Sequence, residues 1–236
     1  MNNLVLIIGG TSGIGLETAN YLLKKDYRVI VSGRKKIKLD KIHCQIVDIN
    51  SDISVKKLHR DISKNFGDIE ALVYCAGISS KKEQIENFDE KTWNNTINTN
   101  VTGFLRTIKY FFPSLKKTEG KVVAVNSIAG RSYSQFSGIE YTASKAALRG
   151  VVKHLASDWF EHKIFINSVF PSMTSTPMLN KKLNKDQIND IKDSLPLKKL
   201  AEPFDTARAI EFLICKENKY ITGTGIDISG GQILNG

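Results

Sequence analysis

Seven short apolar runs, each long enough for one β-strand, recur along the chain with amphipathic segments between them. The runs read NLVLIIGG, YRVIVSG, KIHCQIVDI, EALVYCAG, KVVAVNS, KIFINSVF and GIDISGG. Their β-branched residues follow one another without polar alternation, which is typical of parallel strands buried on both faces. The intervening segments repeat apolar residues at helical spacing. The pattern predicts an α/β fold, a doubly wound parallel sheet of about seven strands with helices on both faces.

Two connections depart from this even spacing. Between Arg34 and Lys41 there is barely room for a crossover helix, so we expect that helix to be vestigial. The lysine-rich segment from Pro171 to Pro203 is instead unusually long. Because ligands bind beyond the carboxyl ends of the strands in such a sheet, residues 172–202 are predicted to form a substrate lid. No repeat or linker divides the chain, and residues 1–236 are predicted to form one domain.

Composition narrows the classes of function. The formal net charge is +10, but the lysines are dispersed and no basic helix with interleaved aromatics occurs. We therefore expect a solvated basic surface and no nucleic-acid partner. No apolar run approaches the roughly 20 residues that span a bilayer, and no signal peptide is evident, so we expect a cytoplasmic protein without membrane contact. The cysteines and histidines lack ligand spacing, which predicts no metal site and buried free thiols at Cys44, Cys75 and Cys215.

The first apolar run leads into the glycine-rich segment GGTSGIG at residues 9–15. Glycine is a poor former of strands and helices, so a cluster there needs a local cause. A tight strand-to-helix turn is one explanation. The other is a backbone that must approach a phosphate, with the amides of the turn and of the next helix directed at it. The position of Gly9, Gly13 and Gly15 between a strand and a helix favours a dinucleotide.

The segment YTASK at residues 141–145 places a tyrosine and a lysine four residues apart on a predicted helix, so that both project from one face. Tyrosine loses its proton near pH 10, and a nearby ammonium is expected to lower that pKa toward the range useful for exchange with a carbonyl or alcohol. An accidental pair on an amphipathic helix is the alternative. Ser127, at the end of the fifth strand, adds a hydroxyl that could bind the same substrate oxygen.

With these segments in this order, the whole sequence resembles the short-chain dehydrogenase/reductase family, and particularly its 3-oxoacyl-[acyl-carrier-protein] reductase-like members. The resemblance implies a Rossmann-type fold. The family's glycine motif, its Asn-Asn-Ala-Gly segment and its C-terminal glycine pair fall on Gly9, Gly13 and Gly15, on residues 74–77, and on Gly230 and Gly231. The chain departs from the family pattern at Ile8, Tyr74, Cys75 and Ser172, where threonine, two asparagines and glycine are usual.

The resemblance also implies the chemistry, a reversible hydride transfer between a nicotinamide and a carbonyl or alcohol carbon. Ser127 and Tyr141 would polarise the carbonyl, and Tyr141 would supply the proton. Lys145 would lower the tyrosine pKa and bind the nicotinamide ribose, while Asn100 would hold a water that links Lys145 to solvent. The implied cofactor contacts are Gly9, Thr11, Ser12, Gly13, Ile14, Gly15, Arg34, Asp48, Ile49, Cys75, Ala76, Gly77, Tyr141, Lys145, Pro171, Ser172, Thr174 and Thr176.

The end of the second strand, VIVSGRKK, bears on which nicotinamide is used. An NAD-preferring protein commonly places a carboxylate there to bind the ribose hydroxyls, whereas this chain has Gly33 followed by Arg34. A guanidinium can bind a 2′-phosphate with two hydrogen bonds. We therefore expect NADP(H) as the cofactor and NAD(H) as the second possibility. The alternative is that Arg34 is simply solvated.

The substrate is less determined by the sequence. A 3-oxoacyl thioester on an acidic carrier protein is the leading hypothesis, with Lys117 and Lys163 expected beside the cleft as docking residues. A sugar, a polyol or a secondary metabolite is the second possibility. A regulator that senses nicotinamide without turnover is a third, although it would not need Ser127, Tyr141 and Lys145 together. Small residues on the helix from Ile139 to His162 predict a homo-oligomer, a tetramer or a dimer.

Overall fold

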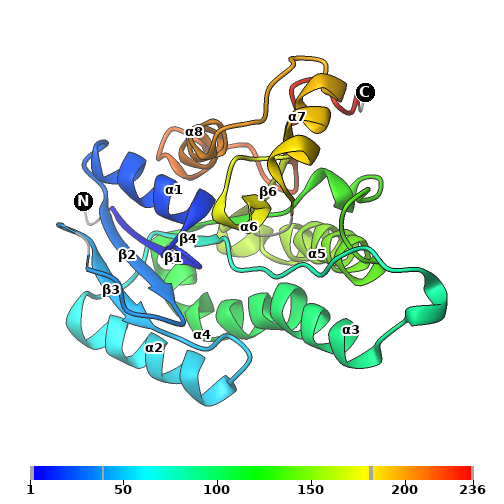
Figure 1. Cartoon of the computed structure of the whole chain (residues 1–236). Helices are drawn as coiled ribbons and strands as arrows, with labels where there is room; N and C mark the ends of the chain where they lie inside the picture. The colour runs from blue at the N-terminus through cyan, green and yellow to red at the C-terminus, as the bar shows by residue number, and fades with distance from the viewer. Residues whose placement is uncertain (1–2, 39, 181–182, 235–236) are drawn as a thin grey trace.

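The described part of the chain contains seven strands, and all of them lie in one parallel sheet. The structure is a computed structural model that describes residues 3–38, 40–180 and 183–234. The strands follow the order β3-β2-β1-β4-β5-β6-β7 across the sheet (Figure 1). Their bounds are β1 (Leu4–Ile8), β2 (Arg28–Gly33), β3 (His43–Ile46), β4 (Ala71–Tyr74), β5 (Lys121–Val125), β6 (Phe165–Pro171) and β7 (Gly225–Ile228). The predicted doubly wound sheet is confirmed.

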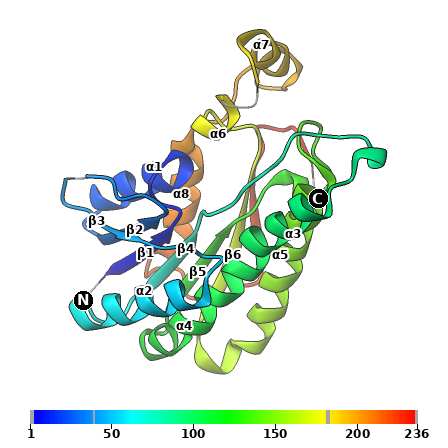
Figure 2. The same ribbon diagram turned by 60° about the horizontal axis from the view of Figure 1, so that its bottom comes forward.

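Helices cover both faces of the sheet (Figure 2). One face packs against α2 (Asp52–Asn65), α4 (Gly103–Thr118) and α5 (Ile139–Asp158), and the other against α1 (Gly13–Leu23) and α8 (Pro203–Ile214). The side chains of β1 alternate between the two cores, with Leu4, Leu6 and Ile8 on the first and Val5 and Ile7 on the second. This double burial explains why the strand sequences are continuously apolar.

The strand order reverses at β1, whose neighbours are β2 and β4. Consecutive crossovers leave in opposite directions there, so their loops diverge and open a crevice at the carboxyl ends of the strands. The glycine-rich turn after β1 lies at this edge, and its Gly9 and Gly10 amides donate to Ser32 O on β2. The helix before α4 is α3 (Glu90–Ile97). A five-residue π-turn, Asn98–Thr102, joins α3 to α4.

The predicted lid segment contains α6 (Pro177–Asn180) and α7 (Lys185–Ser194). Its two ends are joined, because Ala201 N donates to Met173 O and Ser175 N donates to Ala201 O. Apolar lid residues pack around a small core of their own, formed by Ile191, Leu195 and Leu200. Phe136, from the loop after β5, packs against that core. The lid is therefore attached to the rest of the fold beside the carboxyl edge of the sheet.

Three further predictions concern the connection between β2 and β3, the cysteines and membrane contact. Between β2 and β3, the described residues 34–38 and 40–42 contain no helix at all, because the connection is too short, and position 39 lies outside the described residues. Cys44, Cys75 and Cys215 are free, but as residues they are only partly buried. Cys44 and Cys75 pack against the core from its border. In the part of the chain that the structure describes, no helix is long and apolar enough to cross a membrane.

Candidate active site

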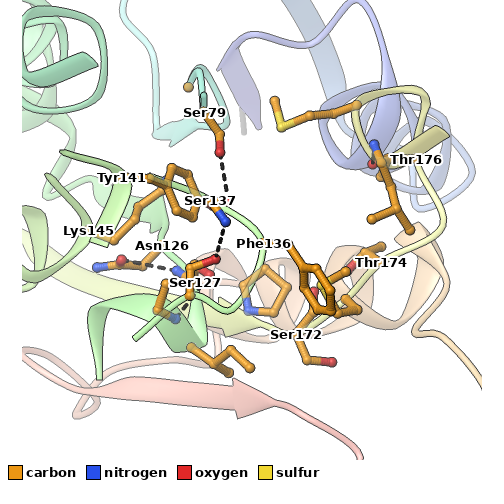
Figure 3. Close-up of a pocket in the computed structure, with 18 of the residues that line it drawn as sticks. Ser79, Asn126, Ser127, Phe136, Ser137, Tyr141, Lys145, Ser172, Thr174 and Thr176 are labelled. Carbon is orange, nitrogen blue, oxygen red and sulfur yellow. Dashed lines mark hydrogen bonds between the residues drawn. The ribbon is translucent and has the colours of Figure 1, made fainter. Parts of the chain in front are cut away.

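The four candidate catalytic residues come from three elements that meet at the carboxyl edge of the sheet. Figure 3 shows three of them, Ser127, Tyr141 and Lys145. Ser127 follows β5, Tyr141 and Lys145 lie on the first turns of α5, and Asn100 lies in the π-turn. Their proximity is seen at Gly77, where a Cβ atom would lie 3.4 Å from Asn100 Oδ1 and 3.7 Å from Lys145 Nζ. The Ser127 and Tyr141 side chains share a hydrogen bond. The structure thus brings together residues that the sequence separates by up to 45 positions.

Ser127 has two local roles. Its backbone is extended at the end of β5, and its Oγ accepts from Ala129 N at 3.2 Å, which caps the short turn that follows. The hydroxyl also bonds the Tyr141 phenol. Arg131 holds the segment after Ser127 against β7, because it pairs with Asp227 and donates to Gly225 O at 2.9 Å. Arg131 was not among the predicted site residues, and its partner Asp227 lies on the last strand.

Lys145 is buried, and its Nζ donates to Val125 O at 2.9 Å. Burial lowers the pKa of this ammonium to about 8. The pKa of Tyr141 is raised, because its phenol is shielded from bulk solvent, and the Ser127 hydrogen bond only partly opposes this. The expectation that Lys145 lowers the tyrosine pKa is wrong for this structure. The ammonium is directed at the Val125 carbonyl and lies 5.7 Å from the centre of the tyrosine ring.

Asn100 is fully buried and every polar atom of its side chain is bonded. Its Oδ1 accepts from Ile78 N at 2.8 Å, and its Nδ2 donates to Ile78 O and to Ser144 Oγ, both at 2.9 Å. One asparagine therefore joins the loop after β4 to the catalytic face of α5, one residue before Lys145. The helical spacing of apolar residues in this segment gives no sign of the π-turn that carries Asn100.

The glycine-rich turn fits a dinucleotide phosphate. Gly13 has φ +52°, a conformation that favours glycine, and a Cβ atom at Gly15 would lie 2.4 Å from Gly9 O. Among the described residues, Ser12 forms no side-chain cap on α1, and the first turn of α1 contains no acidic residue. The amides at this helix start are therefore available to an anion, which the helix dipole also attracts.

The other predicted cofactor contacts surround the same crevice. A cavity of about 410 Å³ is lined by Ile14, Cys75, Gly77, Ser127, Tyr141, Lys145, Pro171, Ser172, Thr174 and Thr176. Burial raises the pKa of the Cys75 thiol to about 12. Asp48 is exposed after β3, where its Oδ1 accepts from Asn50 N, and Ile49 is buried beside it. Arg34 is exposed just after β2. Thr11, within the glycine turn, lies against Gly33, and Ala76 lies against Gly9.

The outer wall of this cavity has two kinds of surface. Lid residues supply apolar side chains, namely Met173, Met178, Leu179 and Leu183, together with Phe136. The loop residues opposite are mostly hydroxyl-bearing, and Ser79 Oγ donates to Ser137 Oγ at 2.9 Å (Figure 3). Within the described ranges, no cluster of three or more histidine, cysteine or acidic side chains could hold a metal ion. The site can therefore hold a partly apolar substrate against a proton donor and a hydroxyl.

Comparison with known proteins identifies the family. The model for short chain dehydrogenases matches residues 3–187. The 3-oxoacyl-[acyl-carrier-protein] reductase of Haemophilus influenzae is 31% identical, covering 98% of both chains, and the acetoacetyl-CoA reductase of an Acinetobacter species is 28% identical with the same coverage. The solved structure of ElxO with NADP bound superposes with a TM-score of 0.90 at 31% identity over 98% of both chains.

The chain belongs to the short chain dehydrogenases. It is an oxidoreductase that acts on a carbonyl or hydroxyl group with a nicotinamide cofactor.

Proposed function

We propose that this enzyme reduces a 3-oxoacyl thioester with NADPH, and that Asn100, Ser127, Tyr141 and Lys145 are its catalytic residues. The observation that carries the proposal is the Ser127–Tyr141 hydrogen bond at the base of a cavity with an apolar outer wall. An acyl chain can pack on the lid while its carbonyl meets the two hydroxyls. The names of the Haemophilus and Acinetobacter relatives support this substrate class. A sugar or polyol is the second candidate, favoured by the serine-rich loop opposite the lid.

The proposed chemistry divides between the cofactor and the protein. The bound nicotinamide supplies the hydride for the carbonyl carbon. Ser127 donates a hydrogen bond to the carbonyl oxygen and stabilises the charge that develops there. Tyr141 transfers its phenolic proton to the same oxygen, and its raised pKa keeps that proton in place at neutral pH. Lys145, on the same face of α5, keeps a positive charge beside the site below about pH 8.

The preference for NADP(H) is proposed from the end of β2. Arg34 is exposed there and can bind a 2′-phosphate. A Cβ atom at Gly33 would lie 2.6 Å from Thr11 Oγ1, so Thr11 occupies the space that a competing carboxylate would need. For this reason Gly33→Asp, which would place a carboxylate at the end of β2, would disturb the glycine turn as well as the specificity. Arg34 is the position to change.

If the substrate is bound to an acidic carrier protein, that carrier must dock on a surface other than the predicted one around Lys117 and Lys163. Lys117 lies in the last turn of α4, before β5 begins, and Lys163 lies just before β6. Both are therefore at the amino edge of the sheet, away from the cleft, and they pair with Asp68 and Glu119. On the cleft side, the backbone of Lys81 pairs with that of Ser137 in the cavity wall, and Lys81 is exposed. We propose Lys81 as a contact for an acidic carrier protein.

We also infer that residues 1–236 form one domain, since all seven strands share a sheet, and that the enzyme is a homo-oligomer, a tetramer or a dimer. The side chains of Ala146 and Ala147 are exposed on α5, and no described atom lies within 4 Å of a Cβ built at Gly150. These small residues leave room for a second helix. Light scattering tests this inference, and a monomer at micromolar concentration would reject it. The cytoplasmic location stays a prediction.

The proposed function is tested with a panel of acetoacetyl-CoA, aldoses and polyols, in which loss of reduced-nicotinamide absorbance is followed. Turnover of the thioester with NADPH is expected. Turnover of sugars alone would favour the second candidate, and binding of NADPH without any turnover would favour a nicotinamide-sensing regulator.

Cofactor preference is tested with Arg34→Ala. Loss of one charge-assisted contact is expected to weaken NADPH binding by roughly ten- to a hundredfold and to leave NADH binding nearly unchanged. Lys38→Ala, an exposed cation nearby in the sequence, is the matched control. Equal effects of Arg34→Ala on both cofactors would show that the 2′-phosphate is not bound by this residue.

A further inference from the structure

The π-turn between α3 and α4 leaves one backbone carbonyl without its usual helical donor. In an α-helix, the amide of Gly103 would donate to Thr99 O, four residues earlier. Here Gly103 N donates to Asn98 O, five residues earlier. This wider turn displaces Asn100 from helical register, and it frees Thr99 O from the helical ladder. A buried carbonyl without a partner is costly, so a donor is needed at this point.

The hydroxyl of Tyr74 supplies that donor. Tyr74 is the last residue of β4, and its Oη donates to Thr99 O at 2.7 Å. The ring is fully buried and packs edge-on against Phe104, with 5.2 Å between ring centres. Burial raises the pKa of the phenol, so that its proton is retained at any working pH. Tyr74 is one of the positions where the sequence departs from the family pattern.

Gly103 is matched to this tyrosine. A Cβ atom at Gly103 would lie 2.7 Å from Tyr74 Oη, and no shift of a fully buried ring is available to relieve that contact. A larger residue at position 103 would therefore displace the hydroxyl from Thr99 O. Tyr74 and Gly103 therefore depend on each other: the Tyr74 hydroxyl can reach Thr99 O because the residue that follows the π-turn is a glycine.

Asn100 is the side chain that depends on this turn. It lies one residue after Thr99, and its three hydrogen bonds to Ile78 and Ser144 join the loop after β4 to α5. We propose that Tyr74 is a positioning residue that holds the π-turn in the one arrangement that aligns the Asn100 amide with the active site. The proposal rests on the proposed function, in which Asn100 is catalytic. Tyr74 itself contacts neither the cavity nor the reacting groups.

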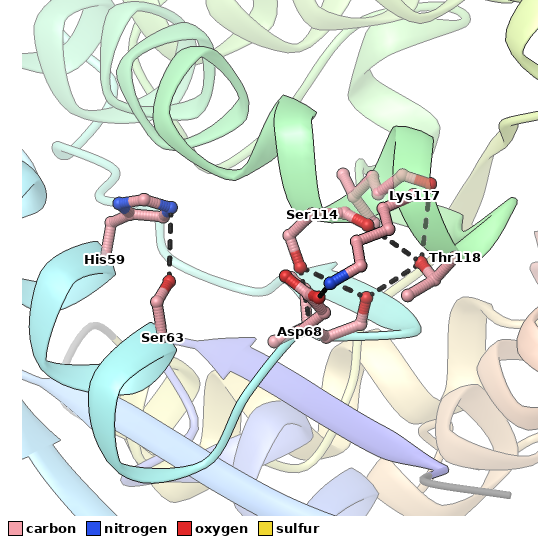
Figure 4. Close-up of polar contacts among 8 residues, drawn as sticks. His59, Ser63, Asp68, Ser114, Lys117 and Thr118 are labelled. Carbon is pink, nitrogen blue, oxygen red and sulfur yellow. Dashed lines mark hydrogen bonds and ion pairs between the residues drawn. The ribbon is translucent and has the colours of Figure 1, made fainter.

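At the opposite ends of α4 and β4, a comparable contact joins the two elements and provides a control (Figure 4). Ser114, on the last turns of α4, accepts from Ile69 N at 2.8 Å through its Oγ, just before β4 begins. Ser114 is nearly as buried as Tyr74. Removing the Tyr74 hydroxyl breaks its buried hydrogen bond to Thr99 O. Removing the Ser114 hydroxyl breaks the bond from Ile69 N and a longer one, of 3.5 Å, to Ile69 O. The difference is that only Tyr74 bonds the turn that carries Asn100.

The test compares Tyr74→Phe with Ser114→Ala in the full-length enzyme. Both variants are expected to lower Tm. Tyr74→Phe is further expected to reduce kcat about tenfold, as for the loss of one hydrogen bond, with the KM for the thioester changed by no more than about twofold. Ser114→Ala is expected to keep the wild-type kcat. Equal kcat values for the two variants would overturn the proposal, since Tyr74 would then act on stability alone.

A double-variant cycle tests whether the effect passes through Asn100. In the Asn100→Ala background, Tyr74→Phe is expected to cause no further loss of kcat, because the group that it positions is gone. An undiminished tenfold loss in that background would overturn the proposal. Gly103→Ala is expected to be less harmful in the Tyr74→Phe background than in the wild type, because the clash with Oη is removed.

Hydrogen exchange separates this inference from the proposed function. Tyr74→Phe is expected to speed exchange of the Thr102 and Gly103 amides, whereas Ser114→Ala is expected to leave them unchanged. This measurement needs no substrate. If the wild type turns over none of the panel, the proposed function fails, and unchanged exchange in Tyr74→Phe would independently show that the tyrosine does not hold the turn.

Discussion

The two edges of the sheet treat polar side chains differently. At the amino edge, Ser114 and Thr118 of α4 bond the backbone of Ile69, and Lys117 pairs with Asp68 at 2.6 Å on the surface (Figure 4). Each of these polar groups either completes the hydrogen bonding of the fold or remains in water. None of these contacts requires a charged group to leave solvent, which is the usual arrangement in a stable domain.

At the carboxyl edge, polar groups are buried beyond what the fold requires. Lys145 is only 5% exposed, and its ammonium has a depressed pKa. Asn126, next to Ser127, has a buried Nδ2 with no hydrogen-bond partner among the described residues, and it lines the cavity. Such groups destabilise a fold, and they are expected where a substrate or cofactor completes the hydrogen bonding. The comparison shows that the cavity at the carboxyl edge is lined by polar groups that are buried at a cost in stability.

The largest expected effect comes from the carboxyl edge. Tyr141→Phe removes the proposed proton donor and keeps the ring, so kcat is expected to fall by about 10²–10⁴-fold. Tm and NADPH affinity are expected to change by no more than the loss of one hydrogen bond allows, far less than kcat. Steady-state kinetics and a cofactor titration measure this. Tyr220→Phe, which alters a tyrosine that is 96% exposed, is the control. A Tyr141→Phe enzyme with most of its activity would remove the tyrosine from the mechanism.

Lys145→Met is expected to inactivate the enzyme and yet stabilise it. The folded pKa of about 8 lies below the usual 10.5, so the unfolded chain binds this proton more tightly. The ammonium therefore destabilises the fold fully below about pH 8, and the effect disappears as the pH rises toward 10.5. Methionine should raise the free energy of unfolding at pH 7 by on the order of 1–3 kcal/mol, and denaturant titrations at pH 7 and pH 10 measure the change.

A stability gain from Lys145→Met that is the same at both pH values would contradict this interpretation, because packing alone would then account for it. A loss of stability at pH 7 would show that the bond from Nζ to Val125 O outweighs the desolvation of the ammonium.

The smallest expected effect comes from the amino edge. Lys117→Ala and Lys163→Ala should leave Tm, kcat and KM unchanged, because both side chains are largely exposed and surface ion pairs contribute little. With a carrier-bound substrate, Lys81→Ala is instead expected to raise KM without changing kcat. Kinetics with carrier-bound and CoA-bound substrate measure the difference. A carrier-specific increase in KM for Lys117→Ala would show that docking reaches the far edge.

Much of the architecture is readable in the sequence. Continuous apolar runs predict the parallel sheet, and the spacing of Tyr141 and Lys145 on a helix, with Ser127 upstream, predicts which groups meet. The π-turn could not be predicted in this way, because residues 90–118 have the composition of an ordinary helix. The prediction that Lys117 and Lys163 lie beside the cleft was wrong. The periodicity of a sequence does not indicate at which edge of the sheet a basic residue lies.

The sequence by itself determined the order of strands and helices and the identity of the reacting groups, because hydrophobic periodicity and side-chain chemistry are local properties. Tertiary structure decided how those groups behave. The pKa of Tyr141 and of Lys145 depends on burial by elements distant in the chain, and Thr11 excludes a side chain at Gly33 only because β1 and β2 lie side by side. The contact between Tyr74 and Thr99 spans 25 positions. Such contacts exist only once the sheet has formed, and so they cannot be predicted from local sequence patterns.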